Sequence, residues 1–277
     1  MEKKLHLYFV SCITLTFLSA LLVLLFFSFS FLPENSTASM SNSATMRELA
    51  VDAEKKERVL KETEDLGQEY IDKITFLGES TTYGLQRYGL LPNNQVWTGA
   101  TCTDGLVKSA GTLSLSPSID KTRIFYPDTS EAITVGEALS RKKPQYLVIT
   151  LGLNNGASYY SEDEFKQCYR ILLNAVVEAS EGTTVILQSL FPISTACRIK
   201  AYTPERIQLC NSWICDLASE YGMHYLDTFS VLADANGYLF PEYDNGGDGI
   251  HLNAAGLTTV LSYVKTHGVT TQEEIVS

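Results

Sequence analysis

Four short apolar runs, separated by segments that begin with helix-capping residues, constrain the fold of this chain more than any other feature. The runs are Lys73–Leu77, Gln145–Leu151, Thr183–Leu187 and His224–Leu226. Their residues are apolar at successive positions rather than at alternate ones, which is typical of strands buried on both faces of a sheet. The runs therefore predict a parallel β-sheet.

Signals for helix starts lie between and after these runs. They are two capping boxes, a Thr-Pro start and an Asn cap before residues 254–266: Thr134 with Glu137, Ser161 with Glu164, Thr203 with Pro204, and Asn253. Strands that alternate with helices over about 200 residues predict an α/β domain with helices on both faces of the sheet. The expected fold is therefore a three-layer α/β/α domain.

Composition excludes several other classes of protein. The chain has 277 residues, of which 45% are hydrophobic and 19% charged, and these values are typical of a globular protein rather than a disordered one. The net charge is −11. Because a field of this sign repels polyanions, we expect no nucleic acid partner. No internal repeat is visible, which argues against a solenoid.

The N-terminal region carries a long apolar segment. Residues 7–32 contain no charged side chain and exceed the length of about 20 residues that a membrane-spanning helix needs. The segment is also longer than the apolar core of a signal peptide and lacks a clean cleavage site. We expect a retained transmembrane anchor; a cleaved signal peptide and a buried core helix are the alternatives.

Flanking charges predict the orientation of this anchor. Lys3 and Lys4 precede it, and the next basic residue is Arg47. Since basic flanks stay in the cytoplasm, residues 1–6 should form a cytoplasmic tail and the bulk of the chain should be extracellular. The Ser- and Asn-rich residues 33–46 predict a flexible linker, residues 47–69 a helical stalk and residues 70–277 the folded domain. The expected location is the cell membrane, with a single pass.

Polar residues follow two of the strand runs at the points where the runs end. Residues 78–80 (Gly-Glu-Ser) follow the first, and residues 152–155 (Gly-Leu-Asn-Asn) follow the second. Ligand sites of parallel sheets lie beyond the carboxyl ends of the strands, so these residues should lie together. Ser80 would expose its hydroxyl, and the amide of Asn154 could stabilise an oxyanion. Taken singly, Ser80 could be a helix cap and Asn154 part of a turn.

A Gly-rich segment near the C-terminus offers the partners that a serine nucleophile needs. Serine is weakly nucleophilic at neutral pH and requires a base beside it. His251 suits this role, and Asp248 can orient its second ring nitrogen if the chain turns tightly. A metal site built on these two residues is the alternative. We expect neither a metal nor a cofactor, because no second His or Cys cluster has ligand spacing.

In this order the motifs resemble the SGNH/GDSL family of serine esterases and lipases, over about residues 70–266. The Gly-Asp-Ser block appears as Gly-Glu-Ser, with Glu79 in place of Asp. The Gly-x-Asn-Asp block ends in Asn155 instead of Asp, and the Asp-x-x-His block is intact. The family also contributes a glycine from the loop after its second strand. Gly99 is the candidate, although Trp97 stands where Asn is common.

The resemblance implies a flavodoxin-like α/β/α fold and a role for each motif residue. Ser80 would be the nucleophile, and its backbone N–H would be one donor of the oxyanion hole. The Gly99 N–H and the Asn154 side chain would be the others. His251 would be the general base, oriented by Asp248. The two departures from the family pattern, Glu79 and Asn155, lie outside this triad, so we expect the activity to be modified rather than lost.

The resulting hypothesis is a membrane-anchored extracellular serine esterase that hydrolyses carboxylic esters. By analogy with the family and from the expected location, the substrate would be a small ester or an O-acetylated glycan of the cell envelope. Five aromatic residues near the motifs could stack on sugar rings or be ordinary core residues: Tyr83, Tyr88, Trp97, Tyr159 and Tyr160. An acyltransferase and a non-catalytic surface binding module remain alternatives, and the oligomeric state is open.

The cysteines give a weaker signal about the compartment. Cys197 and Cys210 flank a loop and could form a disulfide in an oxidising compartment. Buried free cysteines are also common in folded proteins, so both states of this pair stay open at this point.

Overall fold

The computed structural model of the chain describes residue 53 and residues 55–270. The predicted anchor, the linker and the first part of the predicted stalk lie outside these residues. Within the described part of the chain, no helix is both long and apolar enough to span a bilayer.

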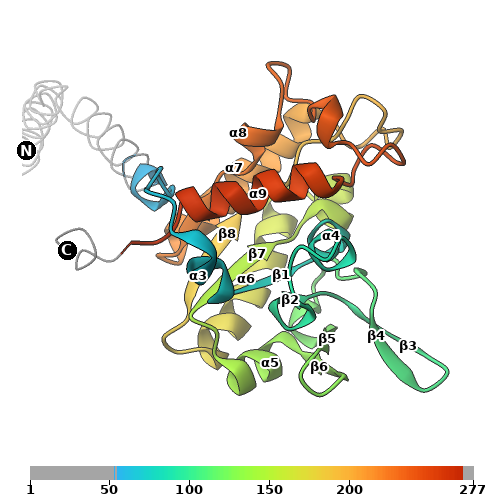
Figure 1. Cartoon of the computed structure of the whole chain (residues 1–277), viewed down its shortest axis with the longest axis vertical. Helices are drawn as coiled ribbons and strands as arrows, with labels where there is room; N and C mark the ends of the chain where they lie inside the picture. The colour runs from blue at the N-terminus through green and yellow to red at the C-terminus, as the bar shows by residue number, and fades with distance from the viewer. Residues whose placement is uncertain (1–52, 54, 271–277) are drawn as a thin grey trace, which may run out of the picture. The chain divides into compact units, whose positions relative to one another are not determined.

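Five parallel strands form the central sheet, in the order β2-β1-β7-β8-β9 (Figure 1). Their bounds are Ile74–Gly78 for β1, Val96–Trp97 for β2, Tyr146–Thr150 for β7, Thr184–Gln188 for β8 and His224–Leu226 for β9. Counted along the chain, this is the 2-1-3-4-5 order of flavodoxin-like sheets. The four apolar runs thus form four of the five strands, and all residues of β1 and β7 are buried.

Helices cover both faces of the sheet, as the alternating pattern predicted. One face packs against α5 (Val135–Lys142), α6 (Glu162–Ala179) and α7 (Pro204–Glu220). The other face packs against α3 (Gly67–Asp72), α4 (Ser80–Arg87), α8 (Phe229–Leu232) and α9 (Ala254–Thr266). In Figure 1, α9 crosses in front of the strands, and α6 lies behind them.

The helix starts lie where the capping signals placed them. The Thr134 hydroxyl accepts a hydrogen bond from the backbone N–H of Glu137 at 3.2 Å, and the Glu137 side chain bonds back to the Thr134 N–H. Ser161 and Glu164 form the second capping box, at the start of α6. These reciprocal bonds satisfy N–H groups that have no partner within the helix.

The segment between β2 and α5 contains elements that the sequence analysis did not predict. Two antiparallel hairpins occupy it: β3 (Ala100–Thr103) with β4 (Leu106–Ser109), and β5 (Arg123–Tyr126) with β6 (Glu131–Thr134). One short helix, η2 (Ile119–Lys121), lies between the two hairpins, and the other short helices lie outside this segment: η1 (Asn93–Gln95), η3 (Leu153–Ala157) and η4 (Pro241–Tyr243). Strands of two to four residues are too short to produce a clear hydrophobic period.

Part of the predicted helical stalk is extended instead. Residues 55–58 are helical, but residues 59–66 run along the folded domain without helical structure. Val59 forms a parallel bridge with Tyr225, and the Leu60 N–H donates to the Tyr225 carbonyl at 2.8 Å. Since β9 is an edge strand with unpaired backbone groups, an extended neighbour satisfies groups that a helix could not.

The cysteine pair is reduced in this structure. Cys197 and Cys210 are both free thiols. Cys210 lies on the buried face of α7, and burial raises the pKa of its thiol to about 11. Of the two states that the sequence left open for this pair, the structure has the unpaired one, and Cys210 is a buried free cysteine.

Candidate active site

A cavity of about 440 Å³ lies beyond the carboxyl end of β1, between α4 and the loop that precedes α9. Ser80, Asp248 and His251 all line it. The three residues come from chain segments about 170 positions apart, and the sequence analysis assigned all three to one site. The structure brings their side chains to the same cavity.

Asp248 and His251 form a tight pair at the edge of this cavity. The Nδ1 of His251 lies 2.6 Å from Oδ2 of Asp248. The other carboxylate oxygen accepts hydrogen bonds from the backbone N–H groups of Ile250, at 2.8 Å, and His251, at 3.1 Å. Partial burial raises the pKa of Asp248, but these hydrogen bonds outweigh burial and hold it below its usual value. An ionised carboxylate only accepts, so Nδ1 carries the proton and Nε2 is left as the basic nitrogen.

Ser80 is the first residue of α4 and is half-buried. The first N–H groups of a helix have no intrahelical acceptor, so the Ser80 N–H is available to a negatively charged ligand. Within the described residues, the Ser80 hydroxyl makes no hydrogen bond, and none joins it to His251. The structure thus places the predicted nucleophile and the predicted base in the lining of one cavity, with the Ser80 hydroxyl unengaged.

Glu79, the residue that departs from the family pattern, is completely buried. Its two carboxylate oxygens accept hydrogen bonds from the backbone N–H groups of Leu153 and Asn154, each at 2.8 Å. Burial raises the pKa of Glu79 to about 7, against the opposing effect of the backbone N–H donors of Asn154, Leu153 and Gly152. The Glu79 side chain therefore links the loop after β7 to the chain position directly before Ser80.

Replacing Glu79 by glutamine should change how stability depends on pH. Because the pKa rises from 4.5 to about 7 on folding, the wild-type chain loses stability as the pH rises through this interval. Glutamine does not ionise and lacks this loss. Between pH 5 and pH 8, the free energy of unfolding of wild type should fall by about 2 kcal/mol relative to Glu79→Gln. Urea unfolding of both proteins at the two pH values measures this, and equal pH dependence would contradict the assignment.

The loop that carries Asn154 is held from two further sides. Tyr202 donates its hydroxyl to the Leu153 carbonyl at 3.0 Å. Arg206 donates to the carbonyls of Gly156 and Ala157 at 3.2 and 2.9 Å. The Asn154 side chain itself donates to the Leu113 carbonyl at 3.4 Å. Asn154 thus reaches the chain segment that follows the β3–β4 hairpin.

This same segment contains a glycine that sequence reasoning missed. Gly111 has a φ of 63°, and a Cβ at this position would lie 3.1 Å from the Cα of Ser80. Gly99 instead packs against the backbone of residues 112–113, because a Cβ at Gly99 would lie 2.6 Å from the Leu113 backbone nitrogen. Neither glycine lines the cavity. A side chain at position 111 would therefore press against Ser80, and the β3–β4 hairpin separates this glycine from Gly99.

The five aromatic candidates fall into different environments. Trp97 is completely buried in the core, and Tyr160 is partly buried with its hydroxyl on the Leu115 carbonyl. Tyr159 is 80% exposed but does not line the cavity. Tyr83 and Tyr88 do line it, and Tyr88 is 40% exposed. Two of the five therefore lie where they can contact a substrate.

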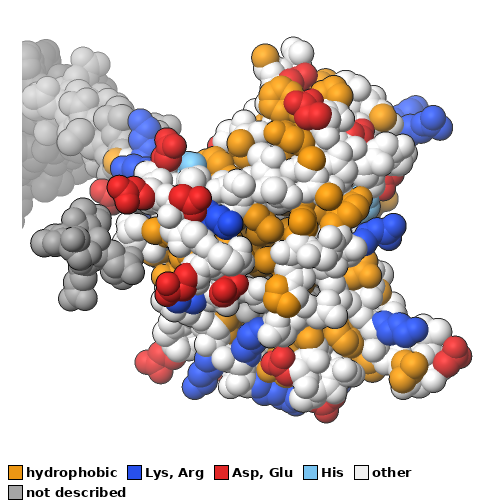
Figure 2. Space-filling model, in the orientation of Figure 1, with side chains coloured by type: hydrophobic (Ala, Val, Ile, Leu, Met, Phe, Trp, Pro, Cys, Tyr) orange, Lys and Arg blue, Asp and Glu red, His pale blue; other side chains and the backbone are white. Residues whose placement is uncertain are grey.

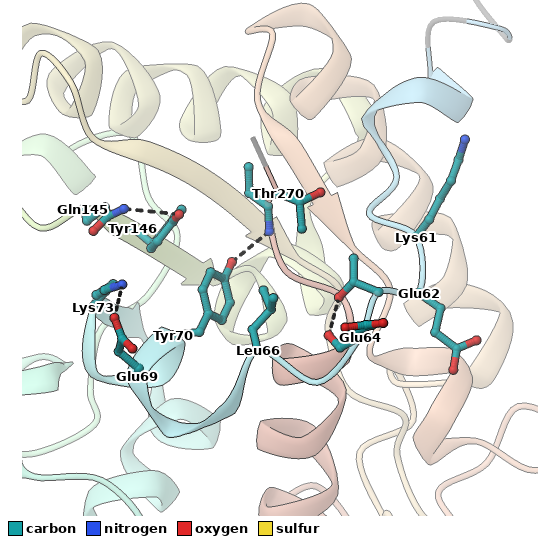
Figure 3. Close-up of a pocket in the computed structure, with 12 residues that line it drawn as sticks. Lys61, Glu62, Glu64, Leu66, Glu69, Tyr70, Lys73, Gln145, Tyr146 and Thr270 are labelled. Carbon is teal, nitrogen blue, oxygen red and sulfur yellow. Dashed lines mark hydrogen bonds and ion pairs between the residues drawn. The ribbon is translucent and has the colours of Figure 1, made fainter. Parts of the chain in front are cut away.

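A larger cavity, of about 780 Å³, lies at the opposite ends of the strands (Figure 3). Lys73, which precedes β1, and Tyr146, which begins β7, contribute to its lining. Figure 3 shows the ion pair between Lys73 and Glu69, whose N–O distance is 2.8 Å. The Val269 N–H donates a hydrogen bond to the hydroxyl of Tyr70. Its lining contains no histidine, cysteine or serine. It therefore lacks the serine and histidine that the predicted triad requires.

Metal-ligating side chains do not cluster near the candidate site. Among residues 55–270, no group of three or more His, Cys, Asp or Glu side chains has an arrangement that could hold a metal ion. The His251 imidazole is instead engaged by Asp248.

The fold and the arrangement at the cavity define a class of protein. A five-stranded parallel sheet carries a serine at the end of its first strand and an Asp–His pair before its last helix. The profile of the GDSL-like lipase/acylhydrolase family matches residues 76–257, which is more than half of the chain. The chain belongs to this family of SGNH/GDSL hydrolases and is a carboxylic ester hydrolase.

A solved structure with low sequence identity shares the fold, and two others align at lower TM-scores. A Streptococcus pneumonia protein provisionally named a platelet activating factor aligns with a TM-score of 0.50 and 18% identity, over 81% of this chain and 97% of that one. Axe2, an acetylxylan esterase from Geobacillus stearothermophilus, aligns at 0.42 and 15%, over 71% and 94%. The periplasmic domain of a lipopolysaccharide acetyltransferase from Salmonella ser. Paratyphi A aligns at 0.45 and 13%, over 74% and 84%. No curated protein sequence matches this chain.

Proposed function

We propose that the protein is a serine esterase that removes O-acetyl groups from glycans of the cell envelope through a Ser80–His251–Asp248 triad. The observation that carries this proposal is the shared cavity, in which the Asp248–His251 hydrogen bond of 2.6 Å leaves the basic nitrogen free. In the first step Nε2 of His251 takes the Ser80 proton as the oxygen attacks the ester carbonyl. The protonated imidazole then donates this proton to the leaving alcohol, and water repeats the sequence on the acyl-enzyme.

The oxyanion formed in each step needs several donors. The N–H of Ser80 at the start of α4 and the side-chain amide of Asn154 are two of them. For the third, we propose the N–H of Gly111 as a stronger candidate than that of Gly99, because a Cβ at position 111 would lie 3.1 Å from the Ser80 Cα. Glu79 acts as a positioning residue, since it holds the Asn154 backbone.

Replacing Asn154 by alanine should lower kcat by about 10²–10³-fold, the usual cost of one oxyanion donor. KM should change far less, because this donor acts mainly on the charge that develops in the transition state. Steady-state kinetics with p-nitrophenyl acetate measures both constants. Asn155→Ala is the matched control, since its amide donates to a different carbonyl, that of Leu115. A fall in kcat of the same size in both variants would argue against a specific role for Asn154.

Two features support an acetylated glycan as the substrate. Tyr83 and Tyr88 at the wall of the cavity offer rings on which a sugar can stack. The predicted anchor at residues 7–32 would hold the domain at the outer face of the cell membrane. Acetate release from acetylated glycans tests the substrate class, and activity only on long acyl chains would refute it. Protease treatment of intact cells tests the location, because an extracellular domain should be digested.

A further inference from the structure

We propose that this site selects esters whose sugar carries an anionic group, and that Arg87 binds that group. The proposal rests on the proposed function and narrows its substrate class. It concerns which acetylated carbohydrate is cleaved, not the chemistry of cleavage.

Arg87 shares both a helix face and a cavity with the nucleophile. It lines the same cavity as Ser80 and His251, and it is the one cationic Lys or Arg side chain among the residues of that lining. Ser80 and Arg87 are the first and last residues of α4. Residues seven apart lie on the same side of a helix, about 10 Å apart along its axis. A sugar whose acetyl ester meets Ser80 therefore extends toward Arg87.

The Arg87 guanidinium has no partner within the described part of the chain. Five of the seven arginines there donate to carboxylates or carbonyls of the protein: Arg58, Arg123, Arg141, Arg170 and Arg206. Arg87 makes no such bond, and the acid in its cavity, Asp248, is engaged by His251. Its five N–H donors are thus available to a ligand.

Helix electrostatics explains only part of this placement. A cation in the last turn of α4 is stabilised by the helix dipole, wherever on the turn it points. The dipole of α4 does not require the Arg87 side chain to line the same cavity as Ser80. Lysine would serve the dipole equally well, so Arg87→Lys separates the two roles.

The surroundings of Arg87 fit an acidic carbohydrate. A guanidinium presents a planar fork that matches a carboxylate or phosphate group. The neighbouring Tyr88 exposes a ring suited to a sugar face. The whole chain carries a charge of −11, and on the face shown in Figure 2 the acidic and basic side chains are interspersed rather than gathered into one basic area. An anionic substrate therefore needs a local cation.

Two matched pairs of esters test the proposal on the full-length protein. One pair is an acetylated galacturonate oligosaccharide and its methyl ester, which differ in the carboxylate charge. The other is an acetylated sugar phosphate and the same acetylated sugar without the phosphate, which differ in the phosphate charge. For wild type, kcat/KM should be at least about tenfold higher on the charged member of one pair, the factor typical of a hydrogen bond to a charged group. This preference should weaken at high salt.

Variants then assign the preference to Arg87. Arg87→Gln should reduce the ratio of charged to neutral kcat/KM about tenfold and abolish its salt dependence, while Arg87→Lys should retain part of it. Lys121→Gln, an exposed change of the same charge outside the cavity, should keep the wild-type ratio. Urea unfolding curves confirm that each variant is folded.

The outcomes separate this inference from the proposed function. Hydrolysis of the neutral esters without any preference for charge overturns the inference alone. A preference that Arg87→Gln retains overturns the role of Arg87. If the wild-type protein hydrolyses no ester and a fluorophosphonate does not label Ser80, the proposed function itself is wrong.

Discussion

Replacement of Ser80 by alanine should reduce kcat on p-nitrophenyl acetate by about 10⁶-fold, which is the scale of loss when a catalytic serine is removed. The variant has no hydroxyl to form the acyl-enzyme, so the burst of p-nitrophenol should also disappear. Because the Ser80 hydroxyl makes no hydrogen bond within the described residues, its loss should not destabilise the fold. Stopped-flow kinetics on wild type and variant measures both effects.

Labelling by a fluorophosphonate gives an independent readout of the same change. Wild type should react and Ser80→Ala should not. Ser118→Ala, a change at an exposed serine outside the cavity, should label like wild type. Hydrolysis by Ser80→Ala at the wild-type rate would refute the assignment of the nucleophile.

Replacement of Asp248 by asparagine should lower kcat by about 10⁴-fold, with little change in structure. The Oδ1 atom of the new side chain can still accept from the Ile250 and His251 N–H groups. Its amide, however, replaces the oxygen that lies 2.6 Å from Nδ1. An amide donates at this point, so the favoured tautomer of His251 would carry its proton on Nε2 and could not accept the Ser80 proton.

Asp244 provides a matched control in the same loop. Its Oδ1 accepts from the Gly246 N–H at 2.8 Å, as Asp248 accepts from Ile250, but it does not contact His251. Asp244→Asn should therefore keep most of the activity. Comparable losses of kcat in the two variants would indicate that the loop conformation, and not the Asp248–His251 bond, is what matters.

Sequence patterns predicted most of the fold because they reflect local physics. The run Gln145–Leu151 has four successive apolar or aromatic residues at positions 146–149, and every residue of the strand within it, Tyr146–Thr150, is buried. A strand covered on both faces buries such a run. Capping boxes such as Ser161 with Glu164 satisfy helix N–H groups within four residues of chain. The hairpins β3–β4 and β5–β6 were missed because strands this short are stabilised by their neighbours rather than by a period of their own.

The extended course of residues 59–66 was missed for a related reason. Charged and apolar residues at helical spacing favoured a helix there, and residues 55–58 are indeed helical. The backbone groups of Tyr225 on the edge strand β9 decide the rest, through the bond from the Leu60 N–H. Such a partner lies more than 160 positions away and leaves no local signal.

The sequence by itself determined four of the five strands of the central sheet and the family, and it proposed the residues of the triad. Each depends on residue types or on contacts within a few positions. Only the tertiary structure decided that Gly111 lies beside Ser80, that Glu79 holds the Asn154 loop, and that Arg87 shares the cavity with Ser80. These relations join segments separated by a hairpin, a strand or a helix, and the packing of the whole sheet sets their distances.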